Sequence, residues 1–474
     1  MNPIEFGTSG WRDIIADTFT FANVRLVTRA IAEEVRAQER PEAGVIVGYD
    51  TRFLSDAFAA EAAAVLAAHG IQVFLCSRDV PTPVVAHEVI RRGAAAGLTI
   101  TASHNPPEYN GLKLSGPTGG PAPPIVTDRI EARVRQLLEE PEAPCPPVEE
   151  MEAKGLVVRI DPRPAYLARL RELVDLRAIA AARLKVAIDL LYGTATGYLD
   201  HLLREAGCAV HALHDGRDPG FGGRAPDPSA ENLQELSEAV RSGGCHLGLA
   251  TDGDADRYGI LDRDGDFIEP NYIFALLFQH LVKTRGWRGG VARSVATSHL
   301  IDAVARNYGL PVYETRVGFK YLGEFIAQDK VVLSGEESAG LSIRGHVPEK
   351  DGILAALLVA EMVAMADGRS LRQLLDALYA EIGTVIRSRR LNFHLSAEQQ
   401  QQLAGRLKDP PGQVAGLRVA GLRTAQGTKL LLEDGSWLLV RPSGTEPLVR
   451  LYIDAHSDEQ LEELTTAARA LLEV

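Results

Sequence analysis

Three carboxylates at alternate positions are the clearest chemical feature of this 474-residue sequence. Asp252, Asp254 and Asp256 follow the apolar run 246–251 directly, so a strand would deliver them together. Because three carboxylates packed this closely repel one another, the pattern favours a bound cation, and all-oxygen ligands suit Mg²⁺. A calcium-binding EF-hand loop is excluded, because its sixth and twelfth positions hold Arg here instead of Gly and Glu. A solvated acidic turn is the remaining alternative.

A second segment places a hydroxyl at the end of another apolar run. Residues 101–106 read Thr-Ala-Ser-His-Asn-Pro, with Ser103 at the centre. A serine-hydrolase elbow would need the pattern G-x-S-x-G, which is absent. Taken alone, such a segment is more often turn capping than catalysis. His104 and Lys113 are candidate proton carriers beside it, with loop packing and phosphate contact as their alternative roles.

Near the C-terminus, residues 441–445 combine a guanidinium, two hydroxyls and the backbone N–H groups of a glycine-containing loop. That set is well suited to binding phosphate. Two further segments, 6–12 and 335–338, are ambiguous when each is considered alone. The glycines of 216–223 do not form G-x-G-x-x-G after a strand, so dinucleotide binding is not expected.

The polar segments end strands of a unit that the chain repeats three times. Short β-branched runs alternate with helical segments, which predicts βαβ units on parallel sheets and an α/β fold. The third strand of each unit delivers a polar loop at its carboxyl end, where open α/β sheets bind ligands. Three such domains would therefore face one central cleft. The predicted strands are 44–50, 71–76 and 96–101 in the first copy, 185–190, 208–213 and 246–251 in the second, and 291–295, 310–314 and 331–338 in the third.

The last hundred residues follow another pattern. A hairpin over 430–440 with an Asp-Gly turn, a strand over 449–453 and an amphipathic helix over 458–472 predict a C-terminal α+β domain. The proline-rich segment 141–147 indicates a linker after the first domain. The domains are therefore predicted to be 1–148, 149–266, 267–378 and 379–474, of which the first three have mixed, mostly parallel sheets.

Composition restricts the function classes. Hydrophobic residues make up 46% and charged residues 24% of the chain, which indicates a globular protein. The net charge of −13 disfavours a nucleic-acid partner, and an anionic substrate would need local basic groups. The longest apolar stretch, 353–366, is too short to span a membrane and is interrupted by Glu361. The N-terminus lacks the pattern of a secretory signal, so a cytoplasmic location without membrane contact is expected. The four cysteines are too scattered for a zinc site or a disulfide framework.

Together these motifs resemble one family, the α-D-phosphohexomutases, in order and over nearly the whole chain. The resemblance implies that Ser103 is a phosphoserine and that its phosphate and the three aspartates hold one Mg²⁺. It also implies that the substrate is a small sugar phosphate and that the protein is a monomer or a dimer. The implied catalytic residues are Ser103, His104, Lys113 and Arg12; the metal ligands are Ser103, Asp252, Asp254 and Asp256; the substrate-binding residues are Arg257, Gly318, Glu336, Ser338 and Lys350; and the phosphate-binding residues are Arg441, Ser443, Gly444 and Thr445.

The sugar loop Glu336-Glu-Ser338 and the segment 349–352 are similar to the phosphoglucomutase branch of the family. The expected reaction is the interconversion of glucose 1-phosphate and glucose 6-phosphate, with glucose 1,6-bisphosphate as intermediate and activator. The alternatives are a phosphomannomutase or dual-specificity mutase, a sugar bisphosphate synthase, and a non-catalytic sugar-phosphate binding protein.

The sequence also departs from the family's pattern at two positions. Gly340 stands where bacterial members with Glu-x-Ser-Gly-His have His, so the role of that His would pass to Lys350 or His346. Ala255 stands in the metal loop where many members have Gly, a harmless change if its φ is negative.

Overall fold

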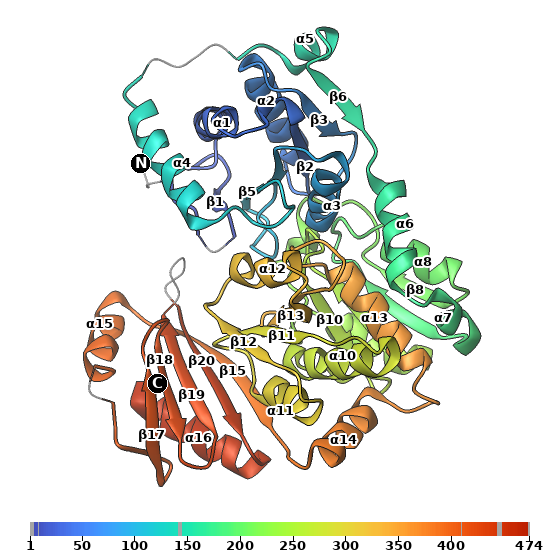
Figure 1. Cartoon of the computed structure of the whole chain (residues 1–474), viewed down its shortest axis with the longest axis vertical. Coiled ribbons are helices and arrows are strands. Elements are labelled where there is room, and N and C mark those ends of the chain that lie inside the picture. Colours follow the sequence, from blue (N-terminus) through green and yellow to red (C-terminus); the bar gives the residue numbers. More distant parts are fainter. Residues whose placement is uncertain (1–3, 8, 141–144, 409, 443–447, 473–474) are drawn as a thin grey trace.

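The computed structural model describes residues 4–7, 9–140, 145–408, 410–442 and 448–472. Its strands form four sheets in succession along the chain, and we call each sheet with its helices a unit (Figure 1). In the view of Figure 1 the first unit lies at the top and the fourth at the lower left, with the third near the centre and most of the second to its right.

The first unit contains a sheet with the strand order β1-β5-β4-β2-β3-β6. β2, β3, β4 and β6 run parallel, β5 is antiparallel to β4, and β1 is antiparallel to β5 and so runs in the same direction as the other four strands. The strands are β1 (Trp11–Ile14), β2 (Val45–Tyr49), β3 (Val73–Cys76), β4 (Ala96–Ile100), β5 (Tyr109–Ser115) and β6 (Val157–Ile160), and the helices are α1 (Phe21–Arg36), α2 (Ser55–Ala68), α3 (Thr82–Arg92), α4 (Pro124–Leu137) and α5 (Val148–Ala153).

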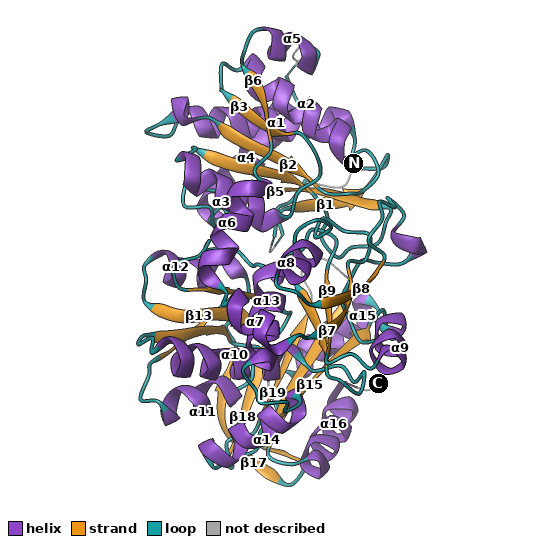
Figure 2. Ribbon diagram, turned by 90° about the vertical axis from the view of Figure 1, so that its right-hand side faces the viewer, coloured by secondary structure: helices purple, strands orange, loops and turns teal. Residues whose placement is uncertain are grey.

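Both faces of this sheet are covered by helices (Figure 2). Because successive side chains of a strand point to opposite faces, Val45 and Val47 join the core that contains α1 and α2. Ile46 joins the core that contains α3. This explains why the β2 run is apolar at every position. β6 comes after the domain boundary expected at residue 148, yet it pairs with β3.

The second and third units repeat the first. The second has β7 (Lys185–Asp189), β8 (Ala209–Leu213), β9 (Leu247–Thr251) and β10 (Tyr258–Leu261), with α6 (Arg163–Leu173), α7 (Leu176–Ala182), α8 (Leu199–Glu205) and α9 (Gln234–Gly243). The third has β11 (Gly290–Ser294), β12 (Val312–Thr315), β13 (Val331–Glu336) and β14 (Gly340–Ile343), with α10 (Pro270–Arg285), α11 (Leu300–Asn307), α12 (Phe319–Ala327), α13 (Gly352–Ala364) and α14 (Leu371–Ile382).

The threefold repeat predicted from the sequence is confirmed by the strand order. The three units share the arrangements β3-β2-β4-β5, β8-β7-β9-β10 and β12-β11-β13-β14, in which the first three strands are parallel. The fourth strand of each arrangement is antiparallel and was not predicted. Each of these strands follows a polar loop directly and is short or rich in polar residues, so it carries little periodic signal.

The fourth unit is an antiparallel sheet with the order β15-β20-β19-β18-β17-β16. The predicted hairpin is confirmed by the pairing of β18 with β19, and the predicted terminal helix is α16. The strands are β15 (Arg387–His394), β16 (Gln413–Val414), β17 (Leu417–Arg423), β18 (Thr428–Leu432), β19 (Trp437–Pro442) and β20 (Leu448–Ala455), and the helices are α15 (Ala397–Arg406) and α16 (Asp458–Leu472).

α13 lies in the core that the second and third units share. It is apolar on all sides, as expected of a fully buried helix. Its one carboxylate, Glu361, is buried and accepts hydrogen bonds from Arg285, and Nε2 of His280 lies 2.8 Å from it. Among the described residues, we find no helix whose length and apolar character would let it cross a membrane.

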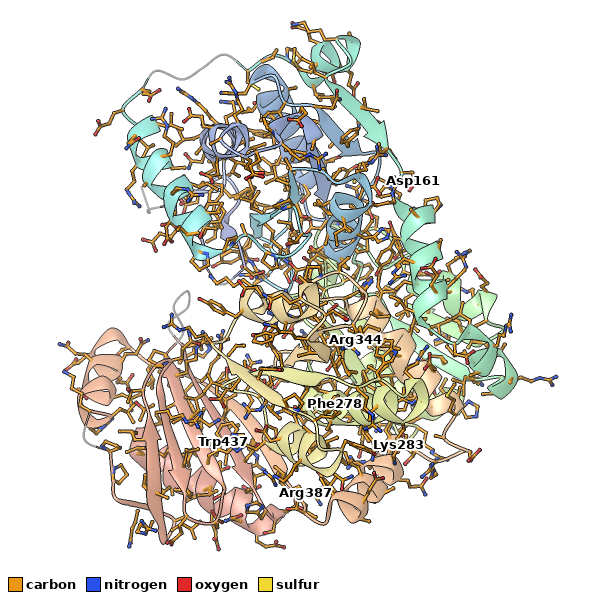
Figure 3. The ribbon with its side chains drawn as sticks, viewed as in Figure 1. Asp161, Phe278, Lys283, Arg344, Arg387 and Trp437 are labelled. Carbon is orange, nitrogen blue, oxygen red and sulfur yellow. The ribbon has the colours of Figure 1, made fainter. Side chains whose placement is uncertain are left out.

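Asp454 of β20 joins the fourth unit to the third. Its buried Oδ2 accepts hydrogen bonds from Ser298 Oγ at 3.0 Å, from the His299 backbone at 2.7 Å and from Trp437 Nε1 at 2.9 Å. Lys429 donates to the Val295 carbonyl across the same boundary, and its ammonium lies 3.7 Å from the centre of the Trp437 ring. Trp437 marks this contact in Figure 3.

Candidate active site

The three polar loops at the ends of β4, β9 and β13 each contain one residue in the left-handed conformation. Ser103 has a φ of 54°, Ala255 of 56° and Ala339 of 65°. Residues with a Cβ rarely adopt this conformation, and such strain concentrates at functional sites. The condition under which Ala255 would be harmless is therefore not met, because its φ is positive.

The three aspartates form a buried cluster at the end of β9. One ligand oxygen from each lies within 4.8 Å of the others. The Oδ1 atoms of Asp254 and Asp256 are buried without a hydrogen-bond partner, which leaves acceptors for a cation. Among the described residues, no other His, Cys, Asp or Glu group forms such a cluster. The donor set and the unpaired oxygens fit a divalent, oxygen-preferring metal.

Two lysines from other units offset the charge of this cluster. Lys113 of β5 places its Nζ 2.5 Å from Asp254 Oδ2 and 2.7 Å from Asp256 Oδ2. Lys350 places its Nζ 2.6 Å from the same oxygen of Asp256. Although burial works in the opposite direction, these charges hold the pKa of Asp256 well below its usual range. Burial and the neighbouring carboxylates raise the pKa of Asp252, so a cation beside it would stabilise its charged form.

Ser103 lies directly against the cluster, although it is 149 residues away in sequence. Its hydroxyl donates to Asp252 Oδ2 at 2.7 Å, and its backbone N–H donates to Thr101 Oγ1 at 2.8 Å. His104 Nδ1 lies 3.4 Å from the Ser103 oxygen. Burial and the charges of Arg257 and Arg12 lower the pKa of His104 well below its usual value. This environment therefore favours the neutral imidazole over the imidazolium.

A cavity of about 320 Å³ opens beside Ser103 and is lined by all four units. The structure brings most of the predicted site residues into its wall or into contact with its wall. Asp252, Asp254, Asp256, Ser103 and Lys113 are buried and do not line the cavity themselves. Ser103 contacts the wall residue His104, and Asp256 contacts the wall residue Lys350. The predicted residues in its wall are Arg12 and His104 from the first unit, Arg257 from the second, Glu336, Ser338 and Lys350 from the third, and Arg441 from the fourth.

Arg12 and Arg257 contribute positive charge to the wall. Arg12 of β1 donates to Asn105 Oδ1 at 2.7 Å, which joins it to the loop 101–108 that carries Ser103, here called the serine loop. The Arg257 backbone donates to Asp252 Oδ1 at 2.9 Å, and its side chain lies 3.9 Å from Asp256. Both guanidiniums therefore flank the space above the carboxylate cluster.

The predicted sugar loop lies at the end of β13. Glu336 accepts a hydrogen bond from the backbone of Gly318 at 2.7 Å, so the structure joins these two predicted residues. Burial and the charge of Glu337 raise the pKa of Glu336 to about 7. Glu337 is itself held by Ser294 Oγ at 2.8 Å. Glu336 and Ser338 both line the cavity and can contact hydroxyl groups of a bound sugar.

Gly340 gives Lys350 the space it needs to reach the cluster. A Cβ at Gly340 would overlap the Cδ and Cγ atoms of Lys350, whose methylenes pass over the glycine. Although burial works in the opposite direction, the charges of Asp256 and Glu349 raise the pKa of Lys350. His346 is buried with its Nε2 2.7 Å from Asp351 Oδ2 and is not part of the cavity wall. Of the two candidates, only Lys350 reaches the cavity.

The predicted phosphate loop is placed only in part. Arg441 lines the cavity, whereas Ser443, Gly444 and Thr445 lie outside the described residues. The cavity also brings in Arg390 of β15 and Arg450 of β20, which sequence reasoning missed. Arg450 pairs directly with Arg441 across the sheet. The signal in the sequence that could have identified Arg450 is its position as a basic residue on the predicted strand that follows the phosphate loop.

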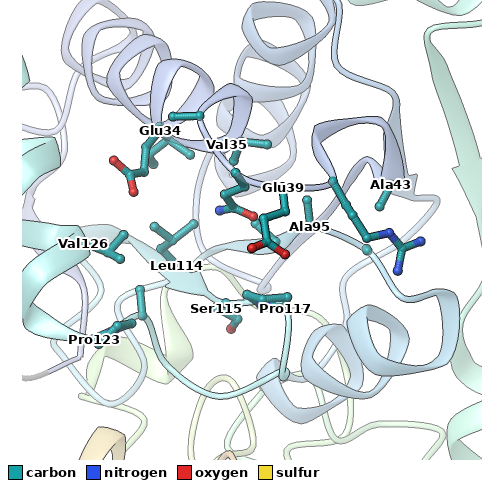
Figure 4. Close-up of a pocket in the computed structure, with 18 of the residues that line it drawn as sticks. Glu34, Val35, Glu39, Ala43, Ala95, Leu114, Ser115, Pro117, Pro123 and Val126 are labelled. Atoms are coloured by element: carbon teal, nitrogen blue, oxygen red, sulfur yellow. The ribbon is translucent and has the colours of Figure 1, made fainter.

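A second pocket, of about 550 Å³, lies within the first unit (Figure 4). It lies between α1, α4 and the ends of β4 and β5, and its lining includes Val35, Ala95, Leu114 and Val126. None of the predicted site residues lines it. The chemistry of the molecule is therefore assigned to the cavity between the units.

Comparisons with known proteins agree with this placement. Residues 3–140, 164–265 and 269–382 match alpha/beta/alpha domains I, II and III of phosphoglucomutase/phosphomannomutase, and residues 394–471 match its C-terminal domain. A phosphoglucomutase/phosphomannomutase of Thermococcus kodakarensis is 31% identical over 99% of this chain and 98% of its own. A probable phosphoglucosamine mutase of Methanothermobacter thermautotrophicus is 33% identical over the same shares. The crystal structure of a candidate phosphomannomutase from Thermus thermophilus has a TM-score of 0.86 and 34% identity, covering 100% of this chain and 99% of that one.

Gly340→Ala should destabilise the protein by about 1–3 kcal/mol, because the added methyl group overpacks the buried Lys350 side chain. In a Lys350→Ala background the obstacle is gone, so the same change should cost little. Urea unfolding of the four proteins in this cycle measures the coupling. Gly405→Ala, at a helix position with open space around the Cβ, is the control and should not destabilise. An equal cost in both backgrounds would contradict the assigned contact.

Asp254→Asn should weaken Mg²⁺ binding by about 100-fold or more, because it removes a charged ligand from the cluster. Isothermal titration calorimetry of the purified protein with Mg²⁺ measures this directly. Asp264→Asn changes an exposed aspartate of the same unit and should leave the affinity within about twofold. Equal affinities of the Asp254 variant and the unchanged protein would refute the metal assignment.

Proposed function

The chain belongs to the phosphoglucomutase/phosphomannomutase family and is a phosphohexomutase, and on this premise we propose that it interconverts glucose 1-phosphate and glucose 6-phosphate. The observation that carries the proposal is the Ser103 hydroxyl, held 2.7 Å from Asp252 beside a cavity that all four units line. A nucleophile beside a cluster suited to a divalent metal and below several cationic side chains is suited to phosphoryl transfer.

In the proposed reaction Ser103 carries a phosphoryl group. Transfer breaks the bond from Ser103 Oγ to phosphorus and forms a bond from a sugar hydroxyl to the same phosphorus. The attacking hydroxyl gives up its proton, and the serine oxygen gains one when the group has left. His104 lies close enough to exchange a proton with the Ser103 oxygen, and Lys113 is the second candidate. Mg²⁺ held by Asp252, Asp254 and Asp256 would supply charge stabilisation for the phosphoryl group.

The remaining residues hold the sugar phosphate in two orientations. Glu336 and Ser338 would contact hydroxyls common to both orientations, and Gly318 keeps Glu336 in place. Arg12, Arg257 and Lys350 would surround the travelling phosphoryl group. The phosphate that does not react would bind Arg441 together with Ser443, Gly444 and Thr445. Because the intermediate, glucose 1,6-bisphosphate, has phosphates at both ends, it can turn round and return one of them to Ser103.

The preference for glucose is supported by the Glu-Glu-Ser loop and by Lys350 in the cavity wall. Glucose and mannose differ only at C2, so the discriminating contacts must come from residues other than Glu336 and Ser338. The segment 316–320, which contributes to the same wall, is the candidate together with Lys350. Glucosamine phosphate is the second candidate substrate, because a similar protein carries the name of a phosphoglucosamine mutase.

Ser103→Ala should abolish turnover, because it removes the hydroxyl that would carry the phosphoryl group. Intact mass of the unchanged protein should show about 80 Da of added mass on a fraction of chains, and the variant should lack it. Ser115→Ala, at another buried serine of the first unit, should keep both properties. Turnover in the Ser103 variant close to that of the unchanged protein would contradict the covalent route.

The substrate assignment is tested with the 1-phosphates of glucose, mannose and glucosamine under one set of conditions with trace bisphosphate. We expect a preference of about tenfold or more in kcat/KM for glucose 1-phosphate, which needs only about 1.4 kcal/mol of differential transition-state binding. Equal efficiency with mannose 1-phosphate would indicate a dual-specificity mutase. Net accumulation of bisphosphate instead of the isomer would indicate a synthase.

A further inference from the structure

Arg52 lies beneath the serine loop and binds its backbone. The residue follows β2 and is fully buried. Its two terminal nitrogens donate to four carbonyl oxygens, three in the loop between β4 and β5 and one at the first residue of β5. The acceptors are those of Ser103 at 2.7 Å, Asn105 at 2.5 Å, Pro106 at 2.7 Å and Tyr109 at 2.9 Å. The remaining nitrogen, Nε, forms an ion pair with Asp50 Oδ2 at 3.2 Å. The two terminal nitrogens are therefore hydrogen-bonded, whereas Nε contacts Asp50 only as an ion pair without hydrogen-bond geometry.

The loop depends on these bonds because its backbone turns sharply. Ser103 adopts a φ of 54°, a conformation that residues with a Cβ adopt only under constraint. The Ser103 carbonyl is directed at Arg52 in the interior, where an acceptor without a partner is costly. A single planar group satisfies four such carbonyls at once. The guanidinium thus fixes the conformation in which the Ser103 hydroxyl reaches Asp252.

Arg52 is itself held in place by a buried network. Asp50 accepts hydrogen bonds from the Arg52 backbone at 3.0 Å and from Ser55 Oγ at 2.7 Å. Asn110, on the strand that leaves the loop, donates to Ser55 Oγ at 2.9 Å. The network therefore connects the end of β2 to the start of β5, and the serine loop lies between them.

We propose that Arg52 is a positioning residue for phosphoryl transfer. It fixes the backbone of the serine loop by donating hydrogen bonds to the loop's carbonyl oxygens. This inference rests on the proposed role of Ser103. Lysine cannot replace Arg52, because an ammonium group offers three donors from one point instead of five in a planar fork. Loss of these hydrogen bonds should misplace the Ser103 oxygen relative to Asp252 without altering the sugar-binding residues.

The test compares Arg52→Lys with Arg285→Lys. Arg285 is the matched control, because its guanidinium also binds a carbonyl and a carboxylate, those of Leu173 and Glu361, far from the serine loop in sequence. Dephosphorylated enzyme is mixed with glucose 1,6-bisphosphate, and phosphorylation of Ser103 is followed by peptide mass. Hydrogen exchange of the amides of 103–110 is measured on the same samples. Steady-state kcat and KM are determined for glucose 1-phosphate.

In Arg52→Lys we expect the phosphorylation rate and kcat to fall about 30-fold or more, since misplacement of a reacting group by about 1 Å costs this much. KM should stay within about threefold, and exchange in the loop should rise about tenfold. In Arg285→Lys all four quantities should stay within about threefold. Unchanged phosphorylation and exchange in Arg52→Lys, or equal losses in both variants, would overturn the inference.

Two further outcomes separate this inference from the proposed function. If Ser103 of the unchanged enzyme is not phosphorylated, the proposed function fails. Hydrogen exchange of the amides of 103–110 still decides whether Arg52 fixes the serine loop. If Arg52→Lys does not fold, Asp50→Asn is used, because it weakens the partner of Nε and leaves the four carbonyl bonds possible. That variant should raise loop exchange about threefold, and unchanged exchange would overturn the inference.

Discussion

Repulsion among three buried carboxylates is the constraint on which the rest of the structure depends. Asp252, Asp254 and Asp256 cannot share this space as anions without positive charge beside them. The second unit, which carries them, does not supply it alone. Lys113 comes from the first unit and Lys350 from the third. The cluster therefore connects three units, and it fits a metal ion as a further positive charge.

Repetition of one topology brings the chemistry together. In each of the first three units a parallel strand ends in a polar loop and an antiparallel strand returns from it. The loops carry Ser103, the aspartates and Glu336, so each unit supplies a different function to one cavity. Each loop also holds a residue with positive φ, and the surrounding packing must offset this strain. Arg52 shows how that is done for the serine loop, through hydrogen bonds to its carbonyls.

The cavity is basic although the protein is acidic. The chain carries a net charge of −13, yet Arg12 and Arg257 face the cavity from one side and Arg390, Arg441 and Arg450 from another. Such local fields act on an anionic substrate more than the net charge does. The arrangement also separates two positive regions, one beside Ser103 and one on the fourth unit. That separation suits a substrate with a phosphate at each end.

The sequence alone determined the strand runs, the threefold repeat, the terminal hairpin and the aspartate cluster, because these are local patterns of hydrophobicity and spacing. It could not show the antiparallel fourth strands, which are either short or rich in polar residues and so carry little periodic signal. Nor could it show that Gly340 leaves space for the Lys350 side chain, or that Arg450 lies opposite Arg441 on the neighbouring strand. The hydrogen bonds from Arg52 to the serine loop were equally hidden. Those contacts join residues far apart in the chain, and only packing of the folded units decides which side chains meet.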